Sequence, residues 1–387
     1  MTSTGNKGSY SAKTILLFFL TALFLLPICF GLGDFAASAQ KRRRPQAAKP
    51  KPSPTPPLSP LEALGPPPPV PTLKKKPEPE VGEGDVISVN TTEVMTPVTV
   101  RDSTGRLVSD LTRNDFRVFE DGLPQPLSDL AIRQVPVDVV LMVDASSSVA
   151  NNIDDFRRAA EGFAERLAPE DRISLIKFDD RVELLQDWTK SRFQLRRALT
   201  RIEPGMFTRF NDALMLAARD QFGAGTKSRH AVIVLSDGID NGRGSTTLEA
   251  ALEALLQSQV TVYVVSNTQI SKASKLAEID SLTGGSAARF NQLRIDDLRE
   301  GIRALDQSEE SLAQLTAATG GRLYKPLSFG ALESTYAEVA DELRHQYALY
   351  YTPLNKARDG GFRRVRVETV NPEFKSQTRV GYFAPKG

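Results

Sequence analysis

Two carboxylates and several hydroxyls stand at places in the sequence where they could together hold a metal ion. Asp144, Ser146 and Ser148 directly follow an apolar run at 137–143. This D-x-S-x-S loop supplies one carboxylate and two hydroxyls, hard oxygen ligands that suit Mg²⁺, Mn²⁺ or Ca²⁺. Asp and Ser are also ordinary turn and N-cap residues, so this loop alone is a weak signal.

Two further loops strengthen the signal. Thr208 ends a Gly-Met-Phe-Thr segment just before a helix expected to begin near Asn211. Asp237 follows the apolar run 231–235 and precedes a glycine. Because ligands bind at the carboxyl ends of strands in a doubly wound sheet, we expect all three loops to open on one edge. These loops would bring together the side chains of Asp144, Ser146, Ser148, Thr208 and Asp237 as candidates for metal binding, and no catalytic residue is predicted.

The elements that must position these loops alternate between apolar β-rich runs and helical patterns from residue 137 onward. Strands are expected at 137–143, 173–178, 231–235 and 260–265, and helices at 152–167, 192–202, 211–222, 248–256 and 332–344. This alternation predicts an α/β fold with a doubly wound, mostly parallel sheet. The helix-prone stretch 267–310 is only weakly amphipathic and is expected to be an insertion at the sheet edge.

A β pattern precedes and follows the α/β part. Residues 84–136 and 346–387 contain short alternating apolar runs separated by turn signals such as Asp121-Gly122. Each segment is too small to fold alone. We therefore expect them to pair into a small antiparallel β module that flanks a domain at 137–345.

The amino-terminal residues have the features of an export signal. Lys7 and Lys13 precede an apolar run at 14–32, and Ala-Ser-Ala at 37–39 is a cleavage pattern. An uncleaved membrane anchor is the alternative, because the run nearly spans a bilayer and basic residues follow it at 41–44. The expected location is the periplasm, the cell envelope or the medium.

A proline-rich linker is predicted at 40–83. Residues 40–80 contain fourteen prolines and nine Lys or Arg against three Glu. Proline fixes φ and removes backbone donors, so the segment should be an extended spacer.

The overall net charge of +2 comes from that linker, since 81–387 carries 43 acidic and 38 basic residues. A mildly acidic folded part argues against nucleic-acid binding. The single cysteine, Cys29, lies in the export segment, which excludes disulfides and thiol chemistry from the mature chain.

The order and spacing of the three loops resemble the metal-ion-dependent adhesion site of von Willebrand A domains. The resemblance covers 137–345, with 267–310 departing from the usual pattern. It implies a divalent cation bound directly by Ser146, Ser148 and Thr208, with Asp144 and Asp237 acting largely through water. The flanks, from Val98-Thr99-Val100 to Glu120-Asp121-Gly122 and from Tyr350-Tyr351 to Tyr382, resemble an acidobacterial-type subfamily that implies no defined substrate.

Three functions from different classes are compatible with these residues. The first is a cell-adhesion or scaffold module, not an enzyme, that binds an Asp or Glu of a partner protein through Mg²⁺, or alternatively Mn²⁺ or Ca²⁺. The second is a structural envelope protein whose metal only stabilises the fold. The third is a hydrolase with Ser146 or Ser148 as nucleophile. That class needs a nearby base, and neither His230 nor His345 lies in the three loops.

Overall fold

The computed structural model describes residues 93–387 except 133–134, 148, 150–151, 223–227, 241–243 and 284–290. The chain divides into two compact units, 1–84 and 85–387, and all described residues belong to the second. The predicted export signal, the proline-rich linker and Ser148 lie outside the described residues. Within the described ranges, no helix is both long enough and apolar enough to cross a bilayer.

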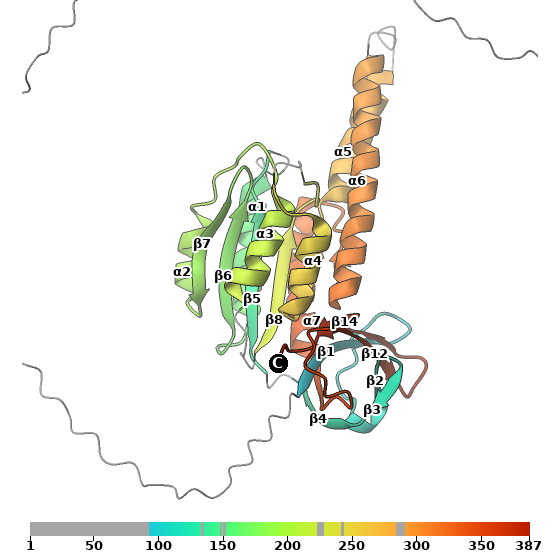
Figure 1. Cartoon of the computed structure of the whole chain (residues 1–387). Helices are drawn as coiled ribbons and strands as arrows, with labels where there is room; N and C mark the ends of the chain where they lie inside the picture. Colours follow the sequence, from blue (N-terminus) through green and yellow to red (C-terminus); the bar gives the residue numbers. More distant parts are fainter. Residues whose placement is uncertain are drawn as a thin grey trace, which may run out of the picture. The chain divides into compact units, whose positions relative to one another are not determined.

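A six-stranded sheet forms the centre of the second unit (Figure 1). Its order is β10-β9-β8-β5-β6-β7, and every strand is parallel to its neighbours except β7. The strands are β5 (Val137–Asp144), β6 (Arg172–Phe178), β7 (Val182–Thr189), β8 (Arg229–Leu235), β9 (Val260–Val265) and β10 (Leu323–Tyr324). All of β5 is buried, as expected of a strand covered on both faces. The predicted doubly wound, mostly parallel sheet is confirmed. The edge strand β7 was not predicted, because charged residues interrupt its apolar pattern.

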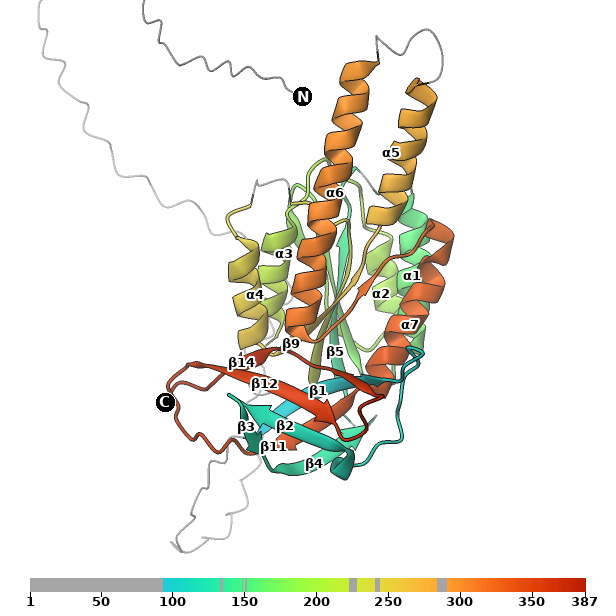
Figure 2. The same cartoon turned by 90° about the vertical axis from the view of Figure 1, so that its right-hand side faces the viewer.

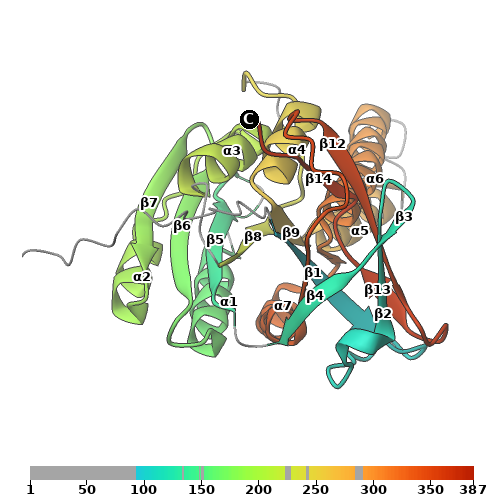
Figure 3. The same cartoon turned by 60° about the horizontal axis from the view of Figure 1, so that its bottom comes forward.

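Helices cover both faces of this sheet (Figure 3). One face packs against α1 (Ile153–Arg166), α2 (Arg192–Leu199) and α7 (Leu332–His345). The other packs against α3 (Phe210–Leu216), α4 (Leu248–Gln257) and the end of α6 (Gln292–Thr319). A π-helical turn at Ala217–Gln221 continues α3. The alternating strand residues therefore fill two separate apolar cores.

The stretch between β9 and β10 folds into a helical hairpin. Helix α5 (Thr268–Thr283) starts just after β9 ends, and α6 returns beside it to Gly320, whose φ of +79° caps the helix in the left-handed conformation. The two helices extend beyond the carboxyl edge of the sheet (Figures 1 and 2). The weak amphipathicity of this stretch follows from its exposed course, since only part of α6 is buried.

Two four-stranded antiparallel sheets make up the β module, in the orders β13-β1-β11-β4 and β14-β12-β2-β3. The strands are β1 (Val94–Arg101), β2 (Phe116–Glu120), β3 (Leu123–Gln125), β4 (Leu127–Ile132), β11 (Tyr347–Tyr351), β12 (Phe362–Thr369), β13 (Lys375–Gln377) and β14 (Gly381–Phe383). A 3-10 turn at Arg113–Asp115 leads into β2, and another at Phe329–Ala331 leads into α7. Strand β11 lies between β1 and β4, and β12 lies between β14 and β2. Both sheets therefore combine strands from before and after the α/β part, and they share one core.

Candidate metal site

Asp144 is the last residue of β5, and its side chain is fully buried. Its Oδ1 accepts a hydrogen bond from the amide of Ser146 at 2.9 Å. Its Oδ2 accepts one from the hydroxyl of Ser236 at 2.6 Å. The carboxylate is therefore held both by its own loop and by the residue that follows β8.

The loop that carries Thr208 lies against the loop that carries Ser146. The amide of Gly205 donates to the carbonyl of Ala145 at 2.7 Å. A Cβ on Gly205 would lie 2.6 Å from the side chain of Asp179, so the loop can pass this close to Asp179 only with glycine at this position. Thr208 is buried just ahead of α3. The contact between the two loops places Thr208 at the same sheet edge as Asp144.

Asp237 follows β8 and is also buried. Its Oδ1 accepts a 3.1 Å hydrogen bond from the amide of Ile239, which fixes the carboxylate within a tight bend. Three residues on, Asp240 accepts a 2.9 Å bond from the amide of Asn211 at the start of α3. The third loop is thus bonded to the helix that the second loop enters.

Four of the five predicted ligands accordingly lie in loops that are bonded to one another at the carboxyl edge: Asp144, Ser146, Thr208 and Asp237. Ser148, the fifth, lies outside the described residues. Ser236 was missed by sequence reasoning, because a serine between a strand and an aspartate looks like an ordinary linker residue. Its position directly after a buried strand that neighbours β5 was the available signal.

The carboxylates of Asp144 and Asp237 are buried at this edge without a nearby cation paired to them in the described residues. Burial, with the charge of Asp237 as the second cause, raises the pKa of Asp144 to about 7. Burial likewise raises the pKa of Asp237, against the opposing effects of the Ile239 amide and the charge of Lys275. Neither carboxylate forms an ion pair with a Lys or Arg of the described ranges. Buried charge of this kind is unfavourable unless it is paired or binds a metal, so the donors fit a cation.

The donor set is poor in carboxylates. In the part of the chain that the structure describes, there is no cluster of three or more His, Cys, Asp or Glu side chains suited to a metal. The two aspartates are instead accompanied by the buried hydroxyl residues Ser146 and Thr208. Such neutral oxygen ligands suit hard divalent cations.

Both histidines lie toward the opposite edge of the sheet. His230 is the second residue of β8, its Nδ1 is 2.9 Å from the carbonyl of Ser258, and its ring stacks on Phe222. Burial lowers its pKa. His345 ends α7, with Nδ1 2.7 Å from the carbonyl of Asp341. Neither is placed to act as a base for a serine at the carboxyl edge.

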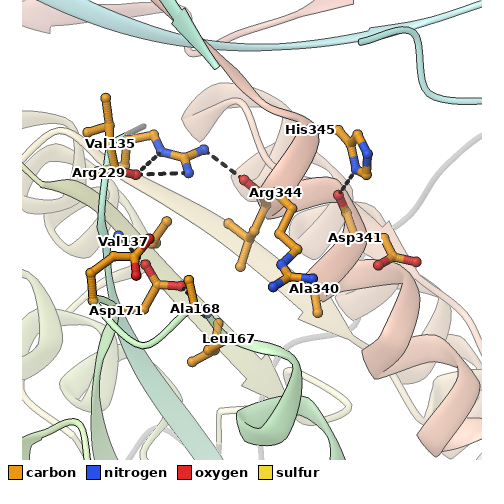
Figure 4. A pocket seen from close by; sticks show the side chains of 12 residues that line it. Val135, Val137, Leu167, Ala168, Asp171, Arg229, Ala340, Asp341, Arg344 and His345 are labelled. Carbon is orange, nitrogen blue, oxygen red and sulfur yellow. Dashed lines mark hydrogen bonds between the residues drawn. The ribbon is translucent and has the colours of Figure 1, made fainter. Parts of the chain in front are cut away.

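A cavity of about 350 Å³ lies at this opposite, amino-terminal edge (Figure 4). Arg229 in its wall donates to the carbonyls of Val135, at 3.2 Å, and Leu343, at 2.7 Å. Asp171 accepts from the amides of Val137 and Ala168, both at 2.8 Å. These polar groups already bond to the protein, so the cavity is a structural junction and contains none of the predicted ligands.

The fold and the site together define a class of protein. A doubly wound sheet with carboxylate and hydroxyl side chains gathered at its carboxyl edge is the arrangement expected of a von Willebrand A domain. Residues 139–240 match the family model of the von Willebrand factor type A domain, and this part of the chain is such a domain. The narrower subfamily resemblance stays a prediction.

Individual relatives are distant. A UPF0353 protein of Mycolicibacterium paratuberculosis (strain ATCC BAA-968 / K-10) is 25% identical over 251 residues, which cover 59% of this chain and 67% of that protein. A von Willebrand factor type A structure from Catenulispora acidiphila is 11% identical, with a TM-score of 0.42, and covers 66% of this chain and 51% of that one.

The proximal thread matrix protein 1 of the mussel byssus is 16% identical, with a TM-score of 0.41. Its structure has a zinc-occupied MIDAS motif, the abbreviation for the metal-ion-dependent adhesion site. That match covers 58% of this chain and 49% of the mussel chain. The chain thus spans about half the length of these solved structures. TM-scores below 0.5 are too low for these likenesses to bear on function.

Proposed function

We propose that this protein binds one divalent cation at the carboxyl edge of the sheet and holds a partner protein through it. One observation carries the proposal. Three mutually bonded loops bring the buried carboxylates Asp144 and Asp237 to the edge where Ser146 and Thr208 are also buried. Ser148 completes the predicted set on sequence grounds.

The chemistry of these donors favours Mg²⁺, with Mn²⁺ or Ca²⁺ as alternatives. The protein's part is to hold the oxygens in place. Asp144 is oriented by the Ser146 amide and the Ser236 hydroxyl, and Asp237 by the Ile239 amide. A cation bound there would supply positive charge that attracts an oxygen from outside the protein.

The partner is proposed to contribute that oxygen from an Asp or Glu side chain. Hydroxyl ligands carry no formal negative charge, so a cation held here keeps much of its own charge and favours an anionic ligand. Beside Thr208, the side chain of Met206 is 72% exposed and offers an apolar contact to the same partner. The folded part is mildly acidic, so attraction must come from the ion and not from a basic surface.

Export to the cell envelope or the medium, with a retained amino-terminal anchor as the alternative, is proposed on the sequence of residues 1–44. In that location the proline-rich linker would let the site reach away from the membrane, because such chains extend about 3 Å per residue. Together these features favour an adhesion or scaffold role.

Calorimetry tests the cation site. Residues 85–387, which form one compact unit, should bind Mg²⁺ or Mn²⁺ at a single site. Asp144→Asn should abolish binding, because it removes the charge while keeping the shape. Asp341→Asn is the matched control, since Asp341 is an exposed carboxylate beside the cavity at the opposite edge. Equal binding by the Asp144 variant and the wild type would refute the site.

Capture from envelope extract with and without EDTA tests the partner. Binding should require the cation, and changing the partner's contacting Asp or Glu to the amide should abolish it. Thr208→Ala should weaken binding even where some metal remains. If chelation sharply lowers the melting temperature but no partner binds, the metal is structural. Hydrolysis that is lost in Ser146→Ala with metal still bound would instead favour an enzyme.

A further inference from the structure

The helical hairpin α5–α6 contacts the loop that carries Asp237. The hydroxyl of Ser308, on α6, donates a buried hydrogen bond to the main-chain carbonyl of Asp237. One turn further along α6, the side chain of Leu312 packs against Gly238, where an added Cβ would lie 2.7 Å from it. Gly238 has a φ of +72°, a conformation that few other residues adopt. The bend that aims Asp237 is therefore held from outside the sheet by α6.

The root of the hairpin, meaning its end nearest the sheet, packs firmly against the rest of the domain. Leu312 and Leu315 lie in the apolar core beneath α6. Glu309, the residue after Ser308 in α6, accepts hydrogen bonds from Thr268 at 2.8 Å and from Lys325 at 3.0 Å. Lys325 directly follows β10 and Thr268 lies shortly after β9, so Glu309 bonds to the segments that follow these two neighbouring strands. A displacement of α6 at this level must therefore move Ser308 and Leu312 together.

The two helices of the hairpin also approach each other closely farther out from the sheet. Helix α5 crosses α6 at Gly301, where an added Cβ would lie 3.3 Å from Cε of Lys275.

We propose that Ser308 and Leu312 are positioning residues for Asp237, so that the position of the α5–α6 hairpin and the affinity of the cation site are coupled. The proposal rests on the proposed function, because it concerns the same cation site. Its physical basis is that the side chain of Asp237 is aimed by a main-chain bend whose carbonyl and glycine are both held by α6. Coupling of this kind is reciprocal: what moves the hairpin changes cation affinity, and the cation steadies the hairpin.

The hairpin extends beyond the edge that carries the site (Figures 1 and 2). A partner seated over the cation would therefore meet α5 or α6, and that contact would act on Asp237 through Ser308. A partner would in this way act on the site through the hairpin as well as through the cation itself.

Calorimetric titration of residues 85–387 with Mn²⁺ tests the coupling, using Ser308→Ala, Ser308→Thr and Ser311→Ala. Ser311 is the matched control, since its hydroxyl bonds only to the carbonyl of Gln307 in its own helix, at 3.1 Å. Loss of one hydrogen bond should weaken Mn²⁺ affinity about twofold to tenfold in Ser308→Ala. Ser308→Thr, which keeps a hydroxyl, should restore most of the affinity, and Ser311→Ala should match the wild type.

Hydrogen exchange supplies a second readout that a merely structural role would not change. Mn²⁺ should slow exchange of the amides at 305–316 in the wild type and should do so far less in Ser308→Ala. If wild type and Ser308→Ala bind Mn²⁺ equally, the coupling is wrong while the cation site stands. If the wild type binds neither Mn²⁺ nor Mg²⁺, both proposals fail. Should Ser308→Ala not fold, unchanged exchange at 305–316 in the wild type on adding Mn²⁺ would still overturn the coupling.

Discussion

The hydroxyl of Ser236 donates a 2.6 Å hydrogen bond to Oδ2 of Asp144 and so joins the ends of β8 and β5. The same hydroxyl accepts a 2.9 Å bond from the amide of Gly238. One small side chain therefore holds the carboxylate of the first loop and the bend of the third. The geometry of the candidate site depends on this shared contact as much as on the ligands themselves.

Ser236→Ala should consequently destabilise the protein without removing any proposed ligand. It leaves a buried carboxylate oxygen and an amide without their partner, which costs about 1–3 kcal/mol. Urea unfolding of residues 85–387 measures the change. Ser334→Ala is the control, because the exposed hydroxyl of Ser334 bonds only to Ala331. A loss no larger than that of the control would show that the Ser236 bond is not needed.

A partly buried ion pair connects the β module to the α/β part. Arg101 of β1 pairs with Glu342 of α7, which is fully buried and also accepts a 2.7 Å bond from the hydroxyl of Tyr324. Arg101→Met should leave the carboxylate without its main partner and lower the free energy of unfolding by about 3 kcal/mol.

Urea unfolding checks this expectation, and the two parts should still unfold in one transition. Arg106→Met tests an exposed pair with Asp102 and should change stability by less than about 1 kcal/mol. Similar effects of the two arginine substitutions would contradict a special role for the partly buried pair.

Removal of the carboxyl-terminal strands should destabilise the first strand of the chain's β module. Truncation after Gln346 removes β11, which pairs with β1 over Val94–Val98, together with β13, which pairs with it over Thr99–Arg101. Amides at 94–101 should then exchange rapidly. Truncation after Val370, which keeps β11 and β12, should leave 94–98 protected. Protection of β1 in the shorter chain would mean that it has another stabilising partner.

The root of the hairpin should respond to acid. Burial raises the pKa of Glu309, but hydrogen bonds from Lys325, Thr268, Gln269 and Lys272 outweigh this effect and lower it to about 2. Because the folded pKa lies below the unfolded value, the stabilisation is complete above about pH 4.5 and is lost as pH falls toward 2.

Glu309→Gln should therefore be less stable than the wild type at neutral pH, and the difference should shrink between about pH 4.5 and pH 2. Urea unfolding across this range measures it. Glu310→Gln, at an exposed neighbouring position, should show no such pH-dependent difference. A constant gap between wild type and Glu309→Gln down to pH 2 would contradict the lowered pKa.

The sequence by itself determined the class of fold. The nearly continuous apolar runs at 137–143, 231–235 and 260–265 indicate strands buried on both faces, because no alternation marks an exposed side. Once these strands alternate with helices, the parallel sheet follows, and its carboxyl edge must collect the loops at 144, 208 and 237. The candidate ligands were therefore predictable, since strand order alone brings such loops together.

Tertiary structure decided what local pattern does not encode. Strand β11 pairs with β1 and β4, and β12 pairs with β2, all of them more than two hundred residues away, and their register depends on packing across the whole module. The bond from Ser236 to Asp144 and the contact of Ser308 with Asp237 join residues far apart in the chain. A serine carries no periodic signal, and its partner is fixed only when two elements pack. The sequence thus specified the candidate ligands, whereas the packed fold specified what holds them in place.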